Sequence, residues 1–212
     1  MIYLIGGSPR CGKTTVAKKL ALKSHTPWFP ADYLASAVSQ YISEEERADK
    51  FPLSNIRKQN NSNDFLYSNY SPSEIVKFYD IQAETAWLGL KAFIEYSVHD
   101  KQDFILEGYQ IQPKLLSQLD KETQKNIRPA FLYKKDKLDI EASMKKGTES
   151  GDWLIAHTKK ESTFAKVAEM VSIFGDKTAI EAKECNMPLF NMDGDFDKKV
   201  EEVVNTLQIL TT

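Results

Sequence analysis

Cysteine and histidine are scarce in this chain of 212 residues, which has two cysteines and three histidines. Cys11 and Cys185 are far apart, and no CxxC pair or Cys/His cluster is present. Structural zinc sites and disulfide frameworks need such clusters, so the sequence predicts neither. A reducing compartment such as the cytoplasm is the simplest setting for this cysteine usage.

An excess of charge and long apolar runs are lacking as well. The formal net charge is −2, so no global field would attract nucleic acid or an anionic membrane. No stretch approaches the ~20 apolar residues of a membrane span, and no basic segment precedes an apolar core at the amino terminus. We therefore expect neither nucleic acid nor a membrane as a partner. The composition indicates no particular oligomeric state.

Strand and helix signals do alternate along the chain, without an internal repeat. Apolar runs predict five strands, at residues 2–6, 26–32, 104–111, 128–133 and 187–192. Apolar residues at helical spacing predict helices, at residues 14–23, 83–97, 114–125, 164–174 and 196–207. This order predicts one α/β domain over residues 1–212, with a central, mostly parallel five-stranded sheet and helices on both faces.

Residues 41–73 interrupt this alternation. They are polar, rich in asparagine and serine, and poor in aliphatic residues. Such a composition is typical of a mobile flap and not of a core.

The stretch GGSPRCGKTT, residues 6–15, lies between the first predicted strand and the first predicted helix. It matches the Walker A pattern GxxxxGK[ST] of phosphate-binding loops (P-loops). Glycines let successive backbone N–H groups approach phosphate oxygens at the positive end of the following helix. We predict that the nucleotide is bound by Gly7, Ser8, Pro9, Arg10, Cys11, Gly12, Lys13, Thr14 and Thr15.

Individual residues of this loop have different expected roles. Lys13 would reach the outer phosphates and act in catalysis, and the Thr14 hydroxyl would hold Mg²⁺. Arg10 is either solvated or in contact with the nucleotide. Cys11 is either a small filler, which we favour, or a thiol whose pKa is lowered near a helix start.

Motifs of other P-loop classes are missing. A GTPase would carry a DxxG switch after its third strand and an NKxD base-reading motif, but DKTA at residues 176–179 lacks the asparagine and the final aspartate. Motor ATPases are usually larger than this chain. Small phosphotransferases remain.

Four stretches together resemble the nucleoside and nucleotide kinase-like superfamily, which includes adenylate, shikimate and gluconate kinases and chloramphenicol phosphotransferase. They are GGSPRCGKTT, ADYL, ILEGYQIQP and IEAKECNMPLFNM. The third is also similar to a stretch of 2-phosphoglycerate kinases. The resemblance implies a three-layer P-loop fold with an acceptor flap at 41–73 and a lid at 134–162. It also implies an ATP- and Mg²⁺-dependent kinase that transfers the γ-phosphate to a small-molecule acceptor. A nucleoside monophosphate kinase and a non-catalytic nucleotide-binding module are the alternatives.

Two carboxylates are candidates for the chemistry. Asp32 ends the predicted second strand, where it could share a crevice with the phosphate loop. There it could orient an acceptor hydroxyl or take its proton, the role that the resemblance implies; the alternative is a cap of the next helix. Glu107 ends a buried strand and could hold the metal through water or serve the acceptor region; the alternative is an ion pair elsewhere.

Acceptor binding is expected in the flap and at the end of the third strand. We select Arg57, because a guanidinium grips carboxylates and phosphates with two hydrogen bonds, and Tyr109. Other candidates, each with solvated loop residue as the alternative, are Arg47, Lys58, Tyr67, Tyr70 and Gln110. Adenylate kinase lids use arginines, but the last arginine here, Arg128, precedes the lid. The lysines that could substitute are Lys134, Lys135, Lys145, Lys146, Lys159 and Lys160.

Overall fold

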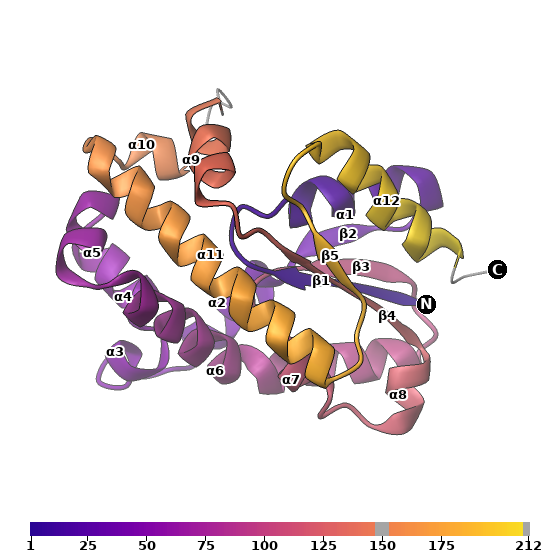
Figure 1. The fold of residues 1–212 in the computed structure, drawn as a ribbon. Helices are drawn as coiled ribbons and strands as arrows, with labels where there is room; N and C mark the ends of the chain where they lie inside the picture. Colours follow the sequence, from indigo (N-terminus) through magenta and orange to yellow (C-terminus); the bar gives the residue numbers. More distant parts are fainter. Residues whose placement is uncertain (147–152, 210–212) are drawn as a thin grey trace.

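The computed structural model describes residues 1–146 and 153–209 and contains a five-stranded parallel sheet (Figure 1). The strand order is β2-β3-β1-β4-β5, and all four pairings are parallel. The strands are β1 (Ile2–Gly7), β2 (Trp28–Pro30), β3 (Phe104–Glu107), β4 (Ile127–Tyr133) and β5 (Leu189–Asn191). The predicted α/β fold class is confirmed. The second and third strands are shorter than expected, so Asp32 lies beyond β2, and residues 108–111 lie beyond β3.

Helices cover both faces of the sheet, because successive strand residues point to opposite sides. Ile2 and Leu4 pack toward one helical layer, whereas Tyr3 and Ile5 pack toward the other. Figure 1 shows α1 and α12 together on one side of the sheet and α11 crossing the other side. The layer that packs on Tyr3 and Ile5 is made of α1 (Lys13–Ser24) and α12 (Phe196–Ile209). The layer on the side of Ile2 and Leu4 includes α2 (Ala31–Gln40), α6 (Pro72–His99), α7 (Pro113–Leu116), α8 (Lys121–Lys125) and α11 (Glu161–Glu184).

The strand register gathers the candidate residues at one edge of the sheet. Glu107 pairs with Ile5 on one side and with Pro30 on the other. The segments that follow β2 and β3 therefore leave the sheet at the same level, and the segment that follows β1 leaves it two residues later. The phosphate loop, Asp32 and Glu107 come from these three neighbouring strand ends.

The flap is more ordered than the sequence predicts. Residues 41–73 contain three short helices, α3 (Arg47–Lys50), α4 (Pro52–Gln59) and α5 (Asn63–Asn69). The next helix, α6, begins at Pro72, well before the predicted start at Ala83. A capping box fixes that start: Ser71 accepts from the Glu74 backbone N–H, and the Glu74 carboxylate accepts from the Ser71 backbone N–H. The single helix predicted at 114–125 is two short helices, α7 and α8.

A third hydrophobic cluster explains why the flap is not separate from the core. Leu53, Leu66 and Tyr67 of the flap are buried. They pack with buried residues of α6, α9 (Lys137–Lys146), α10 (Trp153–Ala156) and α11, namely Ile75, Val76, Tyr79, Ile140, Met144, Leu154, Val167, Ala168, Met170, Val171 and Phe174. A few well-placed side chains are therefore enough to fasten a polar segment to the lid and to α11.

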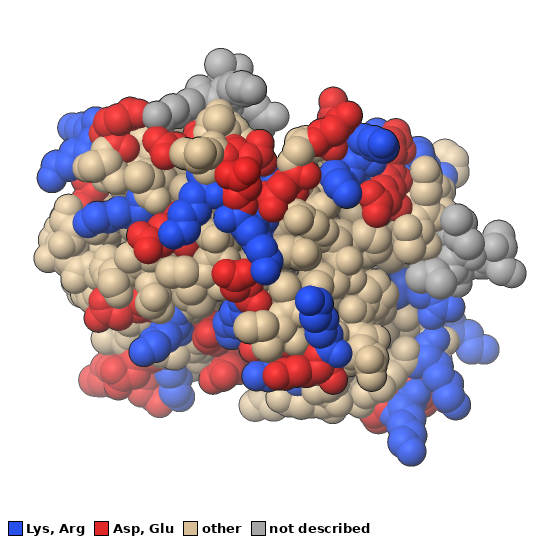
Figure 2. Space-filling model, in the orientation of Figure 1, with Lys and Arg blue, Asp and Glu red and all other residues tan. Residues whose placement is uncertain are grey.

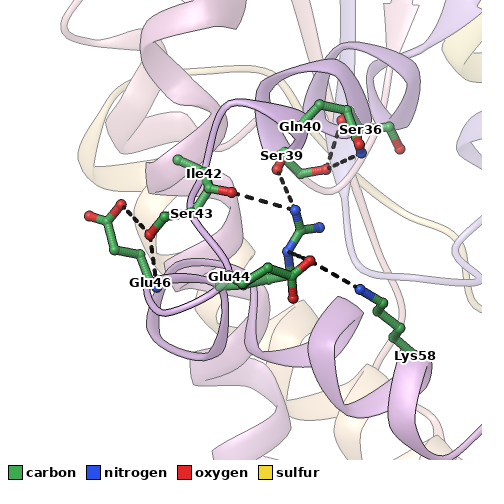
Figure 3. Close-up of polar contacts among 9 residues, drawn as sticks. Ser36, Ser39, Gln40, Ile42, Ser43, Glu44, Glu46 and Lys58 are labelled. Atoms are coloured by element: carbon green, nitrogen blue, oxygen red, sulfur yellow. Dashed lines mark hydrogen bonds and ion pairs between the residues drawn. The ribbon is translucent and has the colours of Figure 1, made fainter.

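Arg47 braces the flap against α2. Lys58 forms an ion pair within the flap, with Glu44 (Figure 3). The Arg47 guanidinium donates to the backbone oxygens of Ser39, at 3.2 Å, and Ile42, at 3.5 Å, near the carboxyl end of α2. Glu44 lies 3.9 Å from Arg47 and 3.2 Å from the Lys58 ammonium group. Both cations thus have partners within the flap.

The surface carries charges of both signs. On the face shown in Figure 2, acidic and basic side chains are interspersed over most of the surface. Among residues 1–146 and 153–209, no helix has the length and apolar character needed to cross a membrane.

Candidate active-site cleft

Backbone geometry allows only glycine at two positions of the phosphate loop. Gly7 has φ +130° and Gly12 has φ +96°. A Cβ atom on Gly7 would lie 1.9 Å from the Leu132 carbonyl oxygen, and one on Gly12 would lie 2.6 Å from the Phe196 ring. The two glycines therefore let the loop turn tightly between β4 and α12 before α1 begins.

Lys13 and Thr14 begin α1 and reach toward different partners. The buried Lys13 ammonium group donates to the Ser8 carbonyl oxygen at 2.7 Å, across the loop. The Thr14 hydroxyl donates to Glu107 Oε1 at 2.9 Å. Arg10, in the left-handed region at φ +62°, lines the cleft together with Pro9 and Thr15. The strained backbone at Arg10 is typical of functional loops.

Cys11 is a filler, as we favoured. Its side chain is buried beneath the loop among the apolar residues that α1 and α12 press against the sheet. Burial raises the pKa of the Cys11 thiol, although the charge of Lys13 opposes this shift. The alternative of a reactive thiol with a lowered pKa is therefore wrong.

Glu107 is a buried carboxyl group at the end of β3. Burial raises its pKa, while the Lys13 charge and the Thr14 hydrogen bond lower it, and the nearby charge of Asp32 raises it again. The environment therefore opposes the charged form and would favour a cation placed beside it.

The oxygens of Thr14 and Glu107 fit Mg²⁺. Their separation is 2.9 Å, and neighbouring ligands of an octahedral Mg²⁺ with metal–oxygen distances of 2.0–2.1 Å lie about 2.9 Å apart. No group of three or more histidine, cysteine or acidic side chains that could hold a metal occurs among the described residues. Mg²⁺ in nucleotide sites needs no such group, because phosphates and waters supply most of its ligands.

Asp32 lies in the first turn of α2 and not at its cap. The N-cap is Pro30, and no side chain makes a capping hydrogen bond there. The capping alternative is therefore wrong. Asp32 lines the cleft with Lys13 and Glu107, and its Oδ1 accepts from Gln110 Nε2 at 2.7 Å.

Gln110 is a residue whose place the sequence did not reveal. It is fully buried, and its Oε1 has no hydrogen-bond partner. It donates to Asp32 and does not line the large cleft. The two residues are 78 positions apart, so no local signal could have paired them.

One cleft of about 1120 Å³ joins these groups to a second region. The phosphate end of the cleft consists of the loop residues with Asp32 and Glu107. We call the opposite region the helical end, because its lining comes from α4, α5, α6, α10 and α11 and from Tyr109 after β3. Its residues are Arg57, Asn63, Tyr67, Tyr79, Tyr109, Trp153, Leu154, Val167 and Met170.

The predicted acceptor residues divide into two groups. Arg57, Tyr67 and Tyr109 line the cleft. The others do not: Arg47 and Lys58 brace the flap, Tyr70 packs on Phe78 with ring centroids 5.1 Å apart, and Gln110 supports Asp32. Four further lining residues were not predicted to bind the acceptor, because they come from helices far apart in the chain: Tyr79, Trp153, Val167 and Met170.

Lid lysines also differ in position. Lys134 is buried, lines the cleft and pairs with Asp139 at 2.9 Å. Lys135 is exposed and pairs with Asp176 at 2.7 Å. Lys159 and Lys160 are exposed and use their backbone N–H groups to bind Asp64. The side chains of Lys145 and Lys146 lie outside the described residues.

Comparison with solved structures places the fold. No protein-family model matches the chain, and no curated protein sequence does either. A gluconokinase from Sinorhizobium meliloti 1021 is similar over 98% of this chain and 91% of its own, with a TM-score of 0.52 and 14% identity. A shikimate kinase from Bacteroides thetaiotaomicron (100% and 98% covered, TM-score 0.47, 13% identity) and a deoxyadenosine kinase from M. mycoides (98% and 100%, 0.43, 13%) are also similar. At these identities the likeness concerns the fold alone. The similarity to the gluconokinase shows that the chain has the fold of P-loop small-molecule kinases.

Proposed function

We propose that the protein is an ATP- and Mg²⁺-dependent kinase that transfers the γ-phosphate to a hydroxyl group of a small-molecule acceptor. The observation that carries this proposal is the shared cleft. Lys13, Thr14, Asp32 and Glu107 line it at the phosphate end, and it continues into the helical end. A cleft of about 1120 Å³ offers room for a nucleotide and a second small molecule.

The phosphate loop would hold the triphosphate. Its backbone N–H groups and the positive end of α1 attract phosphate oxygens. The Lys13 ammonium group, which donates to the Ser8 carbonyl oxygen, would bind the outer phosphates when the nucleotide is present. Thr14 and Glu107 would hold Mg²⁺, directly or through a water on Glu107. When bound, the metal neutralises charge on the phosphates.

Asp32 would orient the acceptor hydroxyl and receive its proton. As the new bond from the acceptor oxygen to the γ-phosphorus forms, the bond to the β–γ bridging oxygen breaks and ADP leaves with that electron pair. Gln110 holds Oδ1 of Asp32, which leaves Oδ2 for the acceptor. Such transfer relies mainly on positioning and on charge stabilisation.

Lys134 is our candidate for the cation that other lids supply with arginine. It is the one lysine of the six whose described side chain lines the cleft. Asp139 holds it in place, and its ammonium group lies 5.8 Å from the centre of the Phe196 ring, next to Gly12. A buried lysine beside the phosphate loop can stabilise negative charge on the transferred group.

An acceptor panel tests this function. Purified protein with ATP and Mg²⁺ should hydrolyse ATP slowly, and one class of hydroxyl compound should stimulate ADP release and become phosphorylated, as detected by phosphorus NMR. Stimulation by nucleoside monophosphates alone would instead identify a nucleoside monophosphate kinase. Tight ATP binding without turnover on any compound would identify a nucleotide-binding module.

A further inference from the structure

The helical end of the cleft is largely apolar. Leu154, Val167 and Met170 are buried aliphatic side chains that line it. Aromatic rings form the rest of the wall, with Tyr79 and Tyr109 in contact at 4.7 Å between ring centroids. Such a wall favours a ligand with an apolar body of its own.

Two polar side chains of this end, Asn63 and Tyr109, have hydrogen-bond partners. The Asn63 amide donates to the Leu154 carbonyl oxygen and to Thr158 Oγ1. The Tyr109 hydroxyl accepts from Gln82 at 2.8 Å. These contacts hold Asn63 and Tyr109 in place within the wall.

Arg57 is the exception. Its Nε is buried and has no hydrogen-bond partner, and its terminal nitrogen reaches only a neutral group, the Tyr79 hydroxyl, at 3.5 Å. Among the described residues, no carboxylate forms an ion pair with it. The guanidinium carbon lies 4.3 Å from the centre of the Trp153 ring, in a cation–π contact. A charge kept in such a place is costly without an anion, and two parallel hydrogen bonds to one anion would offset that cost.

Tyr109 connects this end to the reaction centre. Burial raises the pKa of its hydroxyl, the charge of Asp32 raises it further, and the charge of Arg57 lowers it. Asp32, Tyr109 and Arg57 line the same cleft. A single acceptor in that cleft could therefore contact both Asp32 and Arg57.

We propose that the acceptor is an amphipathic hydroxy compound with one anionic group, a carboxylate or a phosphate. The anion binds Arg57, the apolar body packs on Trp153, Val167 and Met170, and the hydroxyl group lies at Asp32. Among the described residues, Arg57 is the one cation that lines the helical end, so one anionic group is matched. This inference rests on the proposed function for the role of the ligand, and on Arg57 and its walls for the ligand's chemistry.

Fragment binding tests this specificity. Phenylacetate, phenyl phosphate and the neutral benzyl alcohol are titrated calorimetrically, with saturating ADP present so that the phosphate loop is occupied. Both anions, or the one whose chemistry the site prefers, should bind about 10- to 100-fold more tightly than the alcohol, as expected for charge-assisted hydrogen bonds. The anion that binds better distinguishes carboxylate from phosphate.

Variants assign the effect to Arg57. Arg57→Gln should remove the anion preference and leave the affinity for benzyl alcohol unchanged. Arg57→Lys should keep part of it, because a lysine has charge but no fork. Lys58→Gln, which changes an exposed cation on the same helix, is the matched control and should have no effect. Equal binding of anions and alcohol by the wild type, no binding of either anion, or an unchanged preference in Arg57→Gln would overturn the proposal.

A separate titration with ATP keeps the two proposals apart. If ATP binds and is hydrolysed but the anions show no preference, only the acceptor class is wrong. If the anions bind at Arg57 but ATP does not bind, the kinase function fails and the anion site stands.

Discussion

The two ends of the cleft are built in opposite ways. At the phosphate end, six residues of one contiguous loop line the cleft, and in the proposed function much of the nucleotide binding would come from the loop backbone. At the helical end, the nine described lining residues come from five helices and one loop. The first end is suited to a group common to all nucleotides. The second can differ from protein to protein, and it is where acceptor specificity would lie.

Replacement of Lys13 by alanine should have the largest effect and breaks the phosphate end alone. Loss of the ammonium group should lower kcat/KM by about 10³-fold, because the positive charge that would stabilise the transferred phosphoryl group is removed. Steady-state kinetics measure this loss, and circular dichroism should show an intact fold. Lys18→Ala, an exposed lysine on the same helix, is the control. Full activity in Lys13→Ala would refute the phosphate assignment.

Asp32→Asn should have the second largest effect and sharpens the boundary between the two ends. The amide can still accept from a neighbour but cannot take a proton, so kcat should fall by roughly 100-fold or more while ATP affinity is unchanged. Rapid-quench measurement of the transfer step and calorimetry of ATP binding check the two parts. Asp49→Asn, an exposed carboxylate on α3, serves as control. An unchanged transfer rate would leave Asp32 with a structural role.

The same contrast decides what the sequence could predict. The parallel sheet follows from short continuous apolar runs that alternate with amphipathic helices, and the phosphate loop follows from a contiguous pattern whose glycines have steric reasons. Asp32 and Glu107 could be expected in one crevice because parallel strand ends meet at one edge. Each of these inferences needs only local sequence and one general rule of sheet geometry.

The helical end could not be predicted in this way. The pairing of Arg57 with the Trp153 ring joins two residues 96 positions apart, and that of Asp32 with Gln110 spans 78. The flap was expected to be mobile because its composition is polar, yet Leu53, Leu66 and Tyr67 suffice to bury one face of it. Composition averages over a segment, whereas packing depends on a few side chains. The capping box at Ser71 and Glu74, by contrast, is a local signal that could have placed the start of α6.

Glu107→Gln should have the smallest effect and tests whether the strand end belongs to the metal. We expect the Mg²⁺ concentration for half-maximal activity to rise about 10-fold, because an outer or inner ligand loses its charge. Burial raises the pKa of Glu107. As the pH is lowered, the wild-type carboxylate therefore becomes protonated at a higher pH than an exposed glutamate would, and Mg²⁺ affinity falls with that protonation. In the variant this loss of Mg²⁺ affinity at low pH should disappear.

The pH dependence of folding stability has the opposite direction. The buried Glu107 charge destabilises the metal-free fold above the raised pKa, and this destabilisation is lost as the pH falls below it. Metal-free Glu107→Gln should therefore melt at the same temperature as the wild type or higher at pH 7. A lower melting temperature together with an unchanged Mg²⁺ requirement would make Glu107 a structural partner of Thr14 and would confine metal binding to the loop.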